Sequence, residues 1–250
     1  MSTTGKNRLR VQVFPDRETL GRTAADEIAG ELRSRLARQD GVRMIFAAAP
    51  SQQETLEWLR VAEGIDWHRV TAFHMDEYLG LPPRAPQRFA EWLKIALFDH
   101  VPLAKVHLLE PDREGAVRQY AEELAAAPID LVVLGIGVNG HLAFNDPPDA
   151  DLDDPSPVRV VELAEASRRQ QVDDGLFDRL GDVPTEAVTL TVPRLLDAGR
   201  LFCVVPGAAK AAAVGAALND PIGPACPATA LRRHADCTLY LDKESSRHVR

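Results

Sequence analysis

Two kinds of segment alternate along most of this chain, and that alternation restricts its fold more than any other feature. Short runs of apolar and β-branched residues, such as RMIFAAA (43–49), predict β-strands. Between them, apolar residues recur every three or four positions, as in an amphipathic helix. Strands that alternate with helices favour a parallel sheet, because parallel neighbours need a long crossover connection. We therefore predict an α/β fold of the Rossmann-like, doubly wound kind, with a mostly parallel sheet and helices on both faces.

The segment boundaries follow from the same patterns. The run DLVVLGIG (130–137) is the most apolar, which is typical of a central strand covered on both faces. Asp16 is the expected N-cap of the first helix. The length of 250 residues fits one domain, 1–250. The predicted strands are 10–14, 43–49, 69–75, 105–109, 130–137, 158–163, 187–192, 200–205 and 237–242, and the predicted helices are 16–38, 55–62, 87–99, 113–127 and 207–218.

Charge and composition exclude several classes of partner. The formal net charge of −8 argues against nucleic acid, which requires a basic surface. No apolar run approaches the roughly 18 residues of a membrane span, and the first ten residues lack the apolar core of a secretory signal. The three cysteines have no regular spacing, so we expect buried thiols in a protein of the cytoplasm, without a disulfide framework or a zinc site. The alanine- and leucine-rich helix faces leave a homo-oligomer open.

Ligands of a doubly wound sheet bind beyond the carboxyl ends of its strands, so the residues there are the candidates for chemistry. The third predicted strand runs into Asp76 and Glu77. A buried carboxylate there can act as a general base if burial or a like charge raises its pKa. The alternative, equally weighted from the residue types alone, is a pair of loop carboxylates that cap the next helix.

The central predicted strand ends in GIGVNGHLAFNDPP (135–148), where glycines let the backbone turn sharply near a ligand. The spacing of these glycines matches a dinucleotide fingerprint by letter, but the prolines that follow exclude the required helix. His141 lies in this turn with Asn139 and Asp146 nearby to set its tautomer, which favours proton transfer over a structural role. Lys210 follows a later strand in the first turn of a helix, where it either holds an anion or lies on the surface.

Two of these segments resemble a known family. MDEYLGLP (75–82) and LGIGVNGHLAFNDPP (134–148) closely resemble the signature segments of glucosamine-6-phosphate deaminases. The resemblance extends over about residues 11–242, and the wider superfamily holds 6-phosphogluconolactonases, ribose-5-phosphate isomerases and coenzyme A transferases. It includes VPTEAVTLTVPRLLDA (183–198), VVPGAAKAAAV (204–214) and CPATALRRH (226–234).

The resemblance implies a site and a reaction: aldose–ketose isomerisation with loss of ammonia from an amino-sugar phosphate, without metal or organic cofactor. Asp76 would move the proton between C2 and C1, and His141 would open the sugar ring. The remaining residues that it implies are Asp146 and Asn139 in support of the histidine, Glu77, Gly137 and Gly140 in the pocket, and Lys210 on the phosphate.

The second predicted strand departs from the family. Where members carry a glycine-rich phosphate loop, this chain has APSQQET (49–55). Ser51 could still bind an anion there, and Gln52 could contact sugar hydroxyls. Glu54 adds a negative charge where the phosphate would lie. The phosphate arginine of the family also has no clear counterpart near RRQQVDDGLF (168–177). Candidate substitutes are Arg159, Arg168 and Arg169.

These departures leave other functions open. One alternative is a hydrolase of the 6-phosphogluconolactonase type, although MDEY and HLAFND fit the deaminases better. A second is an isomerase of a different or unphosphorylated sugar, because the phosphate loop is atypical. A third is a sugar-phosphate sensor without turnover, which Asp76 and His141 argue against.

Overall fold

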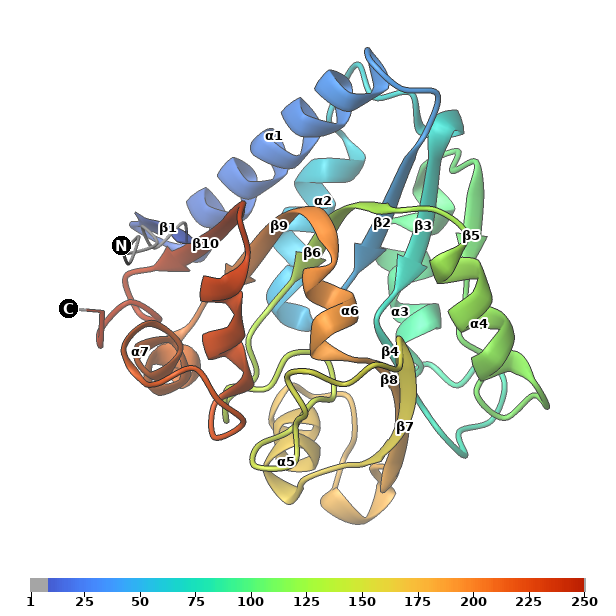
Figure 1. Cartoon of the computed structure of the whole chain (residues 1–250). Coiled ribbons are helices and arrows are strands. Elements are labelled where there is room, and N and C mark those ends of the chain that lie inside the picture. The colour runs from blue at the N-terminus through green and yellow to red at the C-terminus, as the bar shows by residue number, and fades with distance from the viewer. Residues whose placement is uncertain (1–8, 250) are drawn as a thin grey trace, which may run out of the picture.

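The computed structural model describes residues 9–249, which build a seven-stranded parallel sheet and a small three-stranded antiparallel sheet (Figure 1). The large sheet has the order β1-β10-β9-β6-β2-β3-β5, and the small one β4-β8-β7. The strands are β1 (Leu9–Phe14), β2 (Val42–Phe46), β3 (Val70–His74), β4 (Asp76–Tyr78), β5 (Lys105–His107), β6 (Ile129–Leu134), β7 (Val158–Glu162), β8 (Glu186–Leu190), β9 (Ala198–Val205) and β10 (Cys237–Asp242). The α-helices are α1 (Arg17–Leu36), α2 (Gln53–Arg60), α3 (Phe89–Ala96), α4 (Ala116–Ala125), α5 (Glu165–Asp173), α6 (Val192–Leu196) and α7 (Ala211–Asn219).

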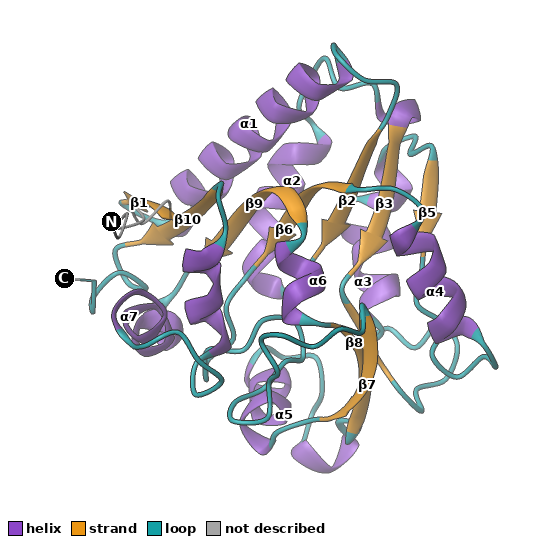
Figure 2. Ribbon diagram, in the orientation of Figure 1, coloured by secondary structure: helices purple, strands orange, loops and turns teal. Residues whose placement is uncertain are grey.

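Helices cover both faces of the large sheet, which confirms the predicted fold class (Figure 2). Alternate residues of each strand pack on opposite faces, as the two-residue period of a strand requires. On β6, Leu131 and Val133 join the core beneath α1, α2 and α3, whereas Val132 and Leu134 join the core beneath α4, α6 and α7. The strand β6 is also the fourth of seven, so the predicted central position is confirmed.

The small antiparallel sheet differs from the expectation. The predicted strands 158–163 and 187–192 form β7 and β8 there, and residues 76–78, expected to follow a strand as loop, pair with β8 as β4. After the buried Val158, half-buried and exposed residues alternate along β7, because one face of this sheet is open to solvent. Together with α5, the small sheet lies beyond the carboxyl ends of the parallel strands (Figure 1), where it walls the site described below.

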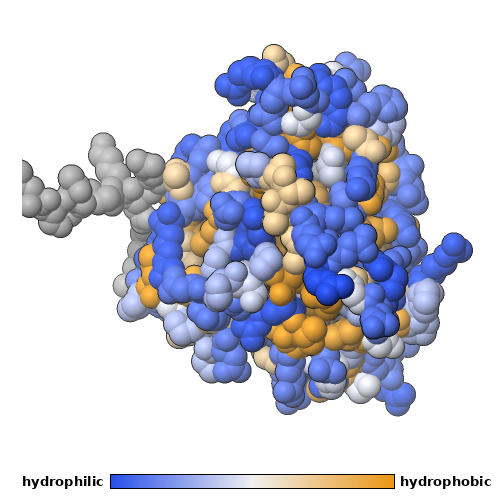
Figure 3. All heavy atoms as spheres, turned by 45° about the vertical axis from the view of Figure 1, so that its right-hand side comes forward, coloured by the Kyte–Doolittle hydropathy of each residue, from blue (hydrophilic) through white to orange (hydrophobic). Residues whose placement is uncertain are grey.

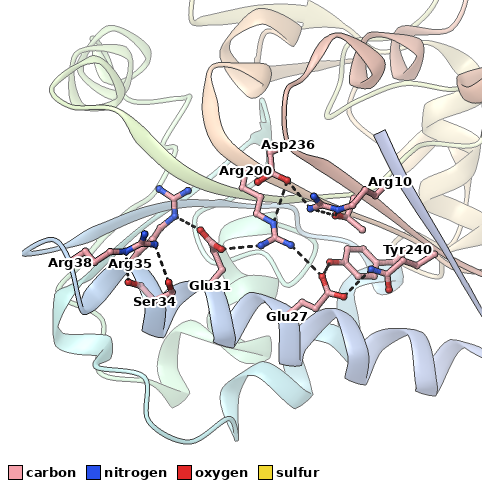
Figure 4. A network of polar contacts seen from close by, with 11 residues as sticks. Arg10, Glu27, Glu31, Ser34, Arg35, Arg38, Arg200, Asp236 and Tyr240 are labelled. Atoms are coloured by element: carbon pink, nitrogen blue, oxygen red, sulfur yellow. Dashed lines mark hydrogen bonds and ion pairs between the residues drawn. The ribbon is translucent and has the colours of Figure 1, made fainter. Parts of the chain in front are cut away.

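Helix α1 begins and attaches through specific polar contacts. The carboxylate of Asp16 accepts a hydrogen bond from the Thr19 amide at 2.7 Å, which confirms the predicted N-cap. The guanidinium of Arg200 on β9 then contacts two carboxylates of the helix, Glu31 at 3.0 Å and Glu27 at 3.3 Å (Figure 4). This network holds the helix across the strands that it covers.

The surface and the thiols agree with the composition. One face of the molecule is mainly hydrophilic, with apolar groups gathered toward its lower middle (Figure 3). Within residues 9–249, no helix has both the length and the apolar character that a membrane crossing requires. Cys203, Cys226 and Cys237 are free and buried, as predicted.

Candidate active site

A cavity opens at the carboxyl edge of the parallel sheet, between the large sheet and the small one. Its walls come from the residues that follow β2, β3 and β6, from α5, and from the 3₁₀ turn before α7 (Ala208–Lys210). It holds about 520 Å³ of space, including the solvent at its mouth.

Asp76 begins β4 and lines this cavity. Only one residue separates it from β3, so the chain passes from the large sheet into the small one at this carboxylate. Its side chain is almost completely buried. Burial, and then the neighbouring charge of Glu77, raise the pKa of the Asp76 carboxyl well above its ordinary value. A carboxylate with a raised pKa is a stronger base, which suits it to proton abstraction.

Glu77 points elsewhere, although it is the next residue. It is fully buried and does not line the cavity. Its carboxylate accepts hydrogen bonds from the amides of Tyr78 (3.0 Å), Phe89 (3.2 Å) and Ala90 (3.0 Å), the last two at the start of α3. The two roles weighed for this pair are therefore divided: Asp76 faces the cavity, and Glu77 caps the next helix.

His141 lies in the turn after β6 and lines the same cavity as Asp76. Its ring packs flat on Gly137, where an added Cβ would come within 2.1 Å of the imidazole. The Nδ1 atom lies 2.8 Å from the Ser167 hydroxyl and 3.1 Å from an oxygen of Asp146. The Ser167 hydroxyl itself donates to Asp146. This arrangement assigns the proton to Nδ1 and leaves Nε2 as an acceptor for a ligand.

Asp146 and Asn139 form a second layer behind the histidine and do not line the cavity. The Asn139 amide donates to Asp146 at 3.0 Å, and the Ala164 amide donates to the other oxygen at 3.1 Å. Burial alone would raise the pKa of Asp146, but the hydrogen bonds from His141, Ser167 and Asn139 lower it. Asp146 is therefore held as a carboxylate that can support a protonated histidine.

Lys210 supplies the cationic end of the cavity. It is 8% exposed, and this burial lowers the pKa of its ammonium from 10.5 to about 8, against the opposing charge of Asp174. The Asp174 carboxylate lies at the exposed rim of the same cavity, just after α5. The buried position favours the anion-contact interpretation of Lys210 over a surface lysine.

The loop after β2 brings Ser51 and Gln52 to the cavity, as predicted. The Gln52 amide nitrogen donates to the Val204 carbonyl on β9 and to the Ser51 hydroxyl, both at 3.1 Å. Glu54, expected to place a charge in the anion site, instead pairs with Arg17 at 2.5 Å outside the cavity.

None of the three arginines considered as substitutes lines the cavity. The Arg168 guanidinium donates to the carbonyls of Leu180 and Val183. Arg159 pairs with Asp154 at 3.1 Å, and Arg169 pairs with Glu165 on its own helix at 2.6 Å. Gly140, predicted to contact the substrate, does not line the cavity. Its positive φ of 87° forms the turn that precedes His141.

The sequence did not point to the part of α5 that closes the cavity. Ser167 positions His141, and Gln170, Gln171 and Asp174 line the wall. The only signal was negative, an acidic segment where the resembling family has an arginine. Their positions depend on how α5 lies over the strand ends, which no local pattern encodes.

A family model and individual relatives in known proteins point to the same family. Residues 15–240 match the family described as glucosamine-6-phosphate isomerases/6-phosphogluconolactonase. Glucosamine-6-phosphate deaminases of Bacillus thuringiensis (strain Al Hakam) and Bacillus cereus (strain AH820) are 36% identical to this chain over 184 residues. Each alignment covers 72% of this chain and 68% of the relative.

Solved structures share the fold. A monomeric glucosamine-6-phosphate deaminase superposes with a TM-score of 0.87 at 24% identity, over 96% of this chain and 99% of that one. A 6-phosphogluconolactonase from Thermotoga maritima superposes with a TM-score of 0.76 at 20% identity, over 94% of this chain and 100% of that one. At these identities the likeness concerns the fold alone.

Proposed function

This chain belongs to the family of glucosamine-6-phosphate isomerases and 6-phosphogluconolactonases, and we propose that it catalyses the deaminase reaction of that family. It is a glucosamine-6-phosphate deaminase-like enzyme, and its curated relatives at 36% identity carry the deaminase name. The reaction converts a 2-amino aldose and water into a 2-ketose and ammonia. The reacting groups proposed for it are Asp76 and His141.

One observation carries the proposal: a base with a raised pKa and an oriented imidazole line the same cavity. Asp76 arrives there from β3, and His141 arrives from the turn after β6. Aldose–ketose isomerisation needs one base within reach of both reacting carbons and a separate group that handles the ring oxygen. Two groups on different strand ends satisfy that requirement.

His141 opens the ring in the first step. Its Nδ1 proton is held by Ser167 and Asp146, so Nε2 accepts the proton of the C1 hydroxyl and returns a proton to the ring oxygen. The imidazolium formed on the way is stabilised by the Asp146 carboxylate. The product of this step is the open-chain aldehyde.

Asp76 moves the proton in the second step. Its carboxylate removes the C2 proton of the 2-ammonio aldehyde while one ammonium proton passes to the C1 oxygen, so that the electron pair of the broken C2–H bond forms the C1=C2 bond of an enolamine. The protonated Asp76 then delivers its proton to C1, and the result is a C2 iminium beside a C1 hydroxymethyl group. Water adds to the iminium carbon, and the C–N bond breaks with release of ammonia. The buried position of Asp76 and the charge of Glu77 support this role, since both raise the pKa of the base.

The test is release of ammonia with an equal amount of ketose from glucosamine-6-phosphate, with unphosphorylated glucosamine and 6-phosphogluconolactone in parallel. Asp76→Asn and His141→Ala are each expected to abolish turnover while the circular dichroism spectrum and Tm stay near those of the wild type. Acid release from the lactone without ammonia from either amino sugar would establish the hydrolase in place of the deaminase.

Two further parts of the assignment are proposals. A cytoplasmic location is supported by the three free thiols, and fractionation of the source cells tests it. Assembly into a homo-oligomer is tested by light scattering of the purified chain.

A further inference from the structure

At the end of the cavity where Lys210 lies, one positive and one negative side chain are present. Among the described lining residues, Lys210 and His141 are the only side chains that can carry positive charge, and no arginine contributes. Asp174 adds a carboxylate at the rim of that end. A phosphate ester carries close to two negative charges at neutral pH. Lys210 and Asp174 together offer it no net positive charge.

The rest of this wall is polar and uncharged. Ser51, Gln52, Gln170 and Gln171 line it, so it presents one hydroxyl and three amide groups. The Gln52 side chain is fully buried, and its amide oxygen has no hydrogen-bond partner within the described structure. This part of the wall therefore adds no positive charge that would offset a phosphate dianion.

Several backbone amides of the loop after β2 are not free to bind a phosphate. Pro50 has no N–H, the Gln52 amide donates to the Ala49 carbonyl at 2.8 Å, and the Gln53 amide donates to Pro50. The Gln52 side chain passes over Gly135, where an added Cβ would lie 3.0 Å from its amide nitrogen. It therefore fills the space beside the loop that a phosphate held by backbone amides would need.

We propose that this enzyme takes a 2-amino sugar whose far end carries hydroxyl groups in place of a phosphate ester. A hydroxyl both donates and accepts, so it can donate to Asp174 and accept from Lys210. This inference rests on the deaminase reaction proposed above, because it specifies only which sugar enters that site.

The experiment compares kcat/KM for ammonia release from glucosamine and from glucosamine-6-phosphate. We expect the wild type to favour glucosamine by about tenfold or more, because Lys210 and Asp174 together carry no net charge that would offset the cost of taking a phosphate dianion out of water. Asp174→Asn removes the rim charge and is expected to reduce that preference several-fold, through KM for the phosphate ester. Asp173→Asn is the matched control: it removes the same charge one residue away, outside the cavity, and is expected to leave the ratio unchanged.

The outcomes separate this inference from the reaction itself. Faster ammonia release from glucosamine-6-phosphate overturns the hydroxyl-end inference and leaves the deaminase standing. Absence of ammonia from both sugars overturns the deaminase proposal. In that case calorimetric titration with 2-amino-2-deoxyglucitol and its 6-phosphate, which have no carbonyl to react, still tests the hydroxyl-end inference. Tighter binding of the 6-phosphate refutes that inference, and tighter binding of the unphosphorylated polyol supports it.

Discussion

Replacement of Asp146 by asparagine tests how the histidine is held. Asp146 receives four donors: its Oδ1 accepts from His141, Ser167 and Asn139, and its Oδ2 accepts from the amide of Ala164. Asparagine offers one oxygen and one NH₂ group. With the oxygen at the Oδ1 position, three donors stay satisfied and only one faces the new NH₂. With the opposite orientation, three donors face it.

The structure therefore predicts that Asp146→Asn keeps the oxygen toward the histidine and preserves its tautomer. What is lost is the negative charge that stabilises the imidazolium. Hydrogen bonds to charged groups contribute about 1.5–3 kcal/mol and neutral ones about 0.5–1.5, a difference of about 1–1.5 kcal/mol. That difference corresponds to a decrease of roughly 5- to 13-fold in kcat.

The donor that faces Ala164 has a separate effect on stability. One unmade hydrogen bond costs about 1–3 kcal/mol. For a domain of this size that is a fall in Tm of roughly 2–12 °C. Asp149→Asn removes the same charge from an exposed position nearby and is expected to change neither quantity.

The assay is steady-state ammonia release with the better amino sugar, together with thermal unfolding followed by circular dichroism. A decrease of a thousandfold or more in a folded variant would show that the ring had lost its tautomer, contrary to the hydrogen-bond count. A decrease of less than about threefold would show that the Asp146 charge does not act on the proton transfer.

Three other substitutions have defined outcomes. Glu77→Gln removes the charge that, after burial, raises the pKa of Asp76, so the acidic limb of the pH–rate profile moves to lower pH; a limb that stays in place contradicts the coupling. Gly137→Ala places a Cβ 2.1 Å from the His141 ring, and the displaced ring lowers kcat about a hundredfold. Lys210→Met raises the free energy of unfolding at pH 7 by about 3 kcal/mol, since a buried lysine with a pKa of about 8 in place of 10.5 destabilises the folded state below pH 8. The unfolded chain binds the extra proton between those two pH values, so this gain shrinks as pH rises from 8 to 10.5 in denaturant titrations.

Gly181→Ala is the control for the glycine variant, because nothing lies within 4 Å of its added Cβ and its φ is not positive. Unchanged kcat in both alanine variants would mean that the imidazole does not need its contact with the bare backbone.

Several parts of the site could be predicted because they depend on local patterns. The strand periods placed Asp76 and His141 beyond buried strands, and parallel strands bring their carboxyl ends to one edge. The N-cap Asp16 was equally visible, since a cap needs only its own first turn.

Other parts could not be predicted because they depend on packing between distant segments. Short apolar and β-branched runs identified β7 and β8 as strands but did not say which strands they pair with. The direction of Glu77 depends on where α3 begins in space, twelve residues later. Arg168 was a candidate anion contact by sequence, but its guanidinium donates hydrogen bonds to the carbonyls of Leu180 and Val183.

The sequence by itself determined the class of fold, the positions of Asp76 and His141 at the ends of buried strands, and the absence of a glycine-rich phosphate loop. Only the tertiary structure decided that Ser167 orients the histidine, that Glu54 turns away to Arg17, and that Asp174 faces the cavity with Lys210. The physical reason is range. Backbone periodicity and caps involve neighbours a few residues apart, whereas the charge and hydrogen-bond balance of a cavity is a sum over side chains from every element that packs around it.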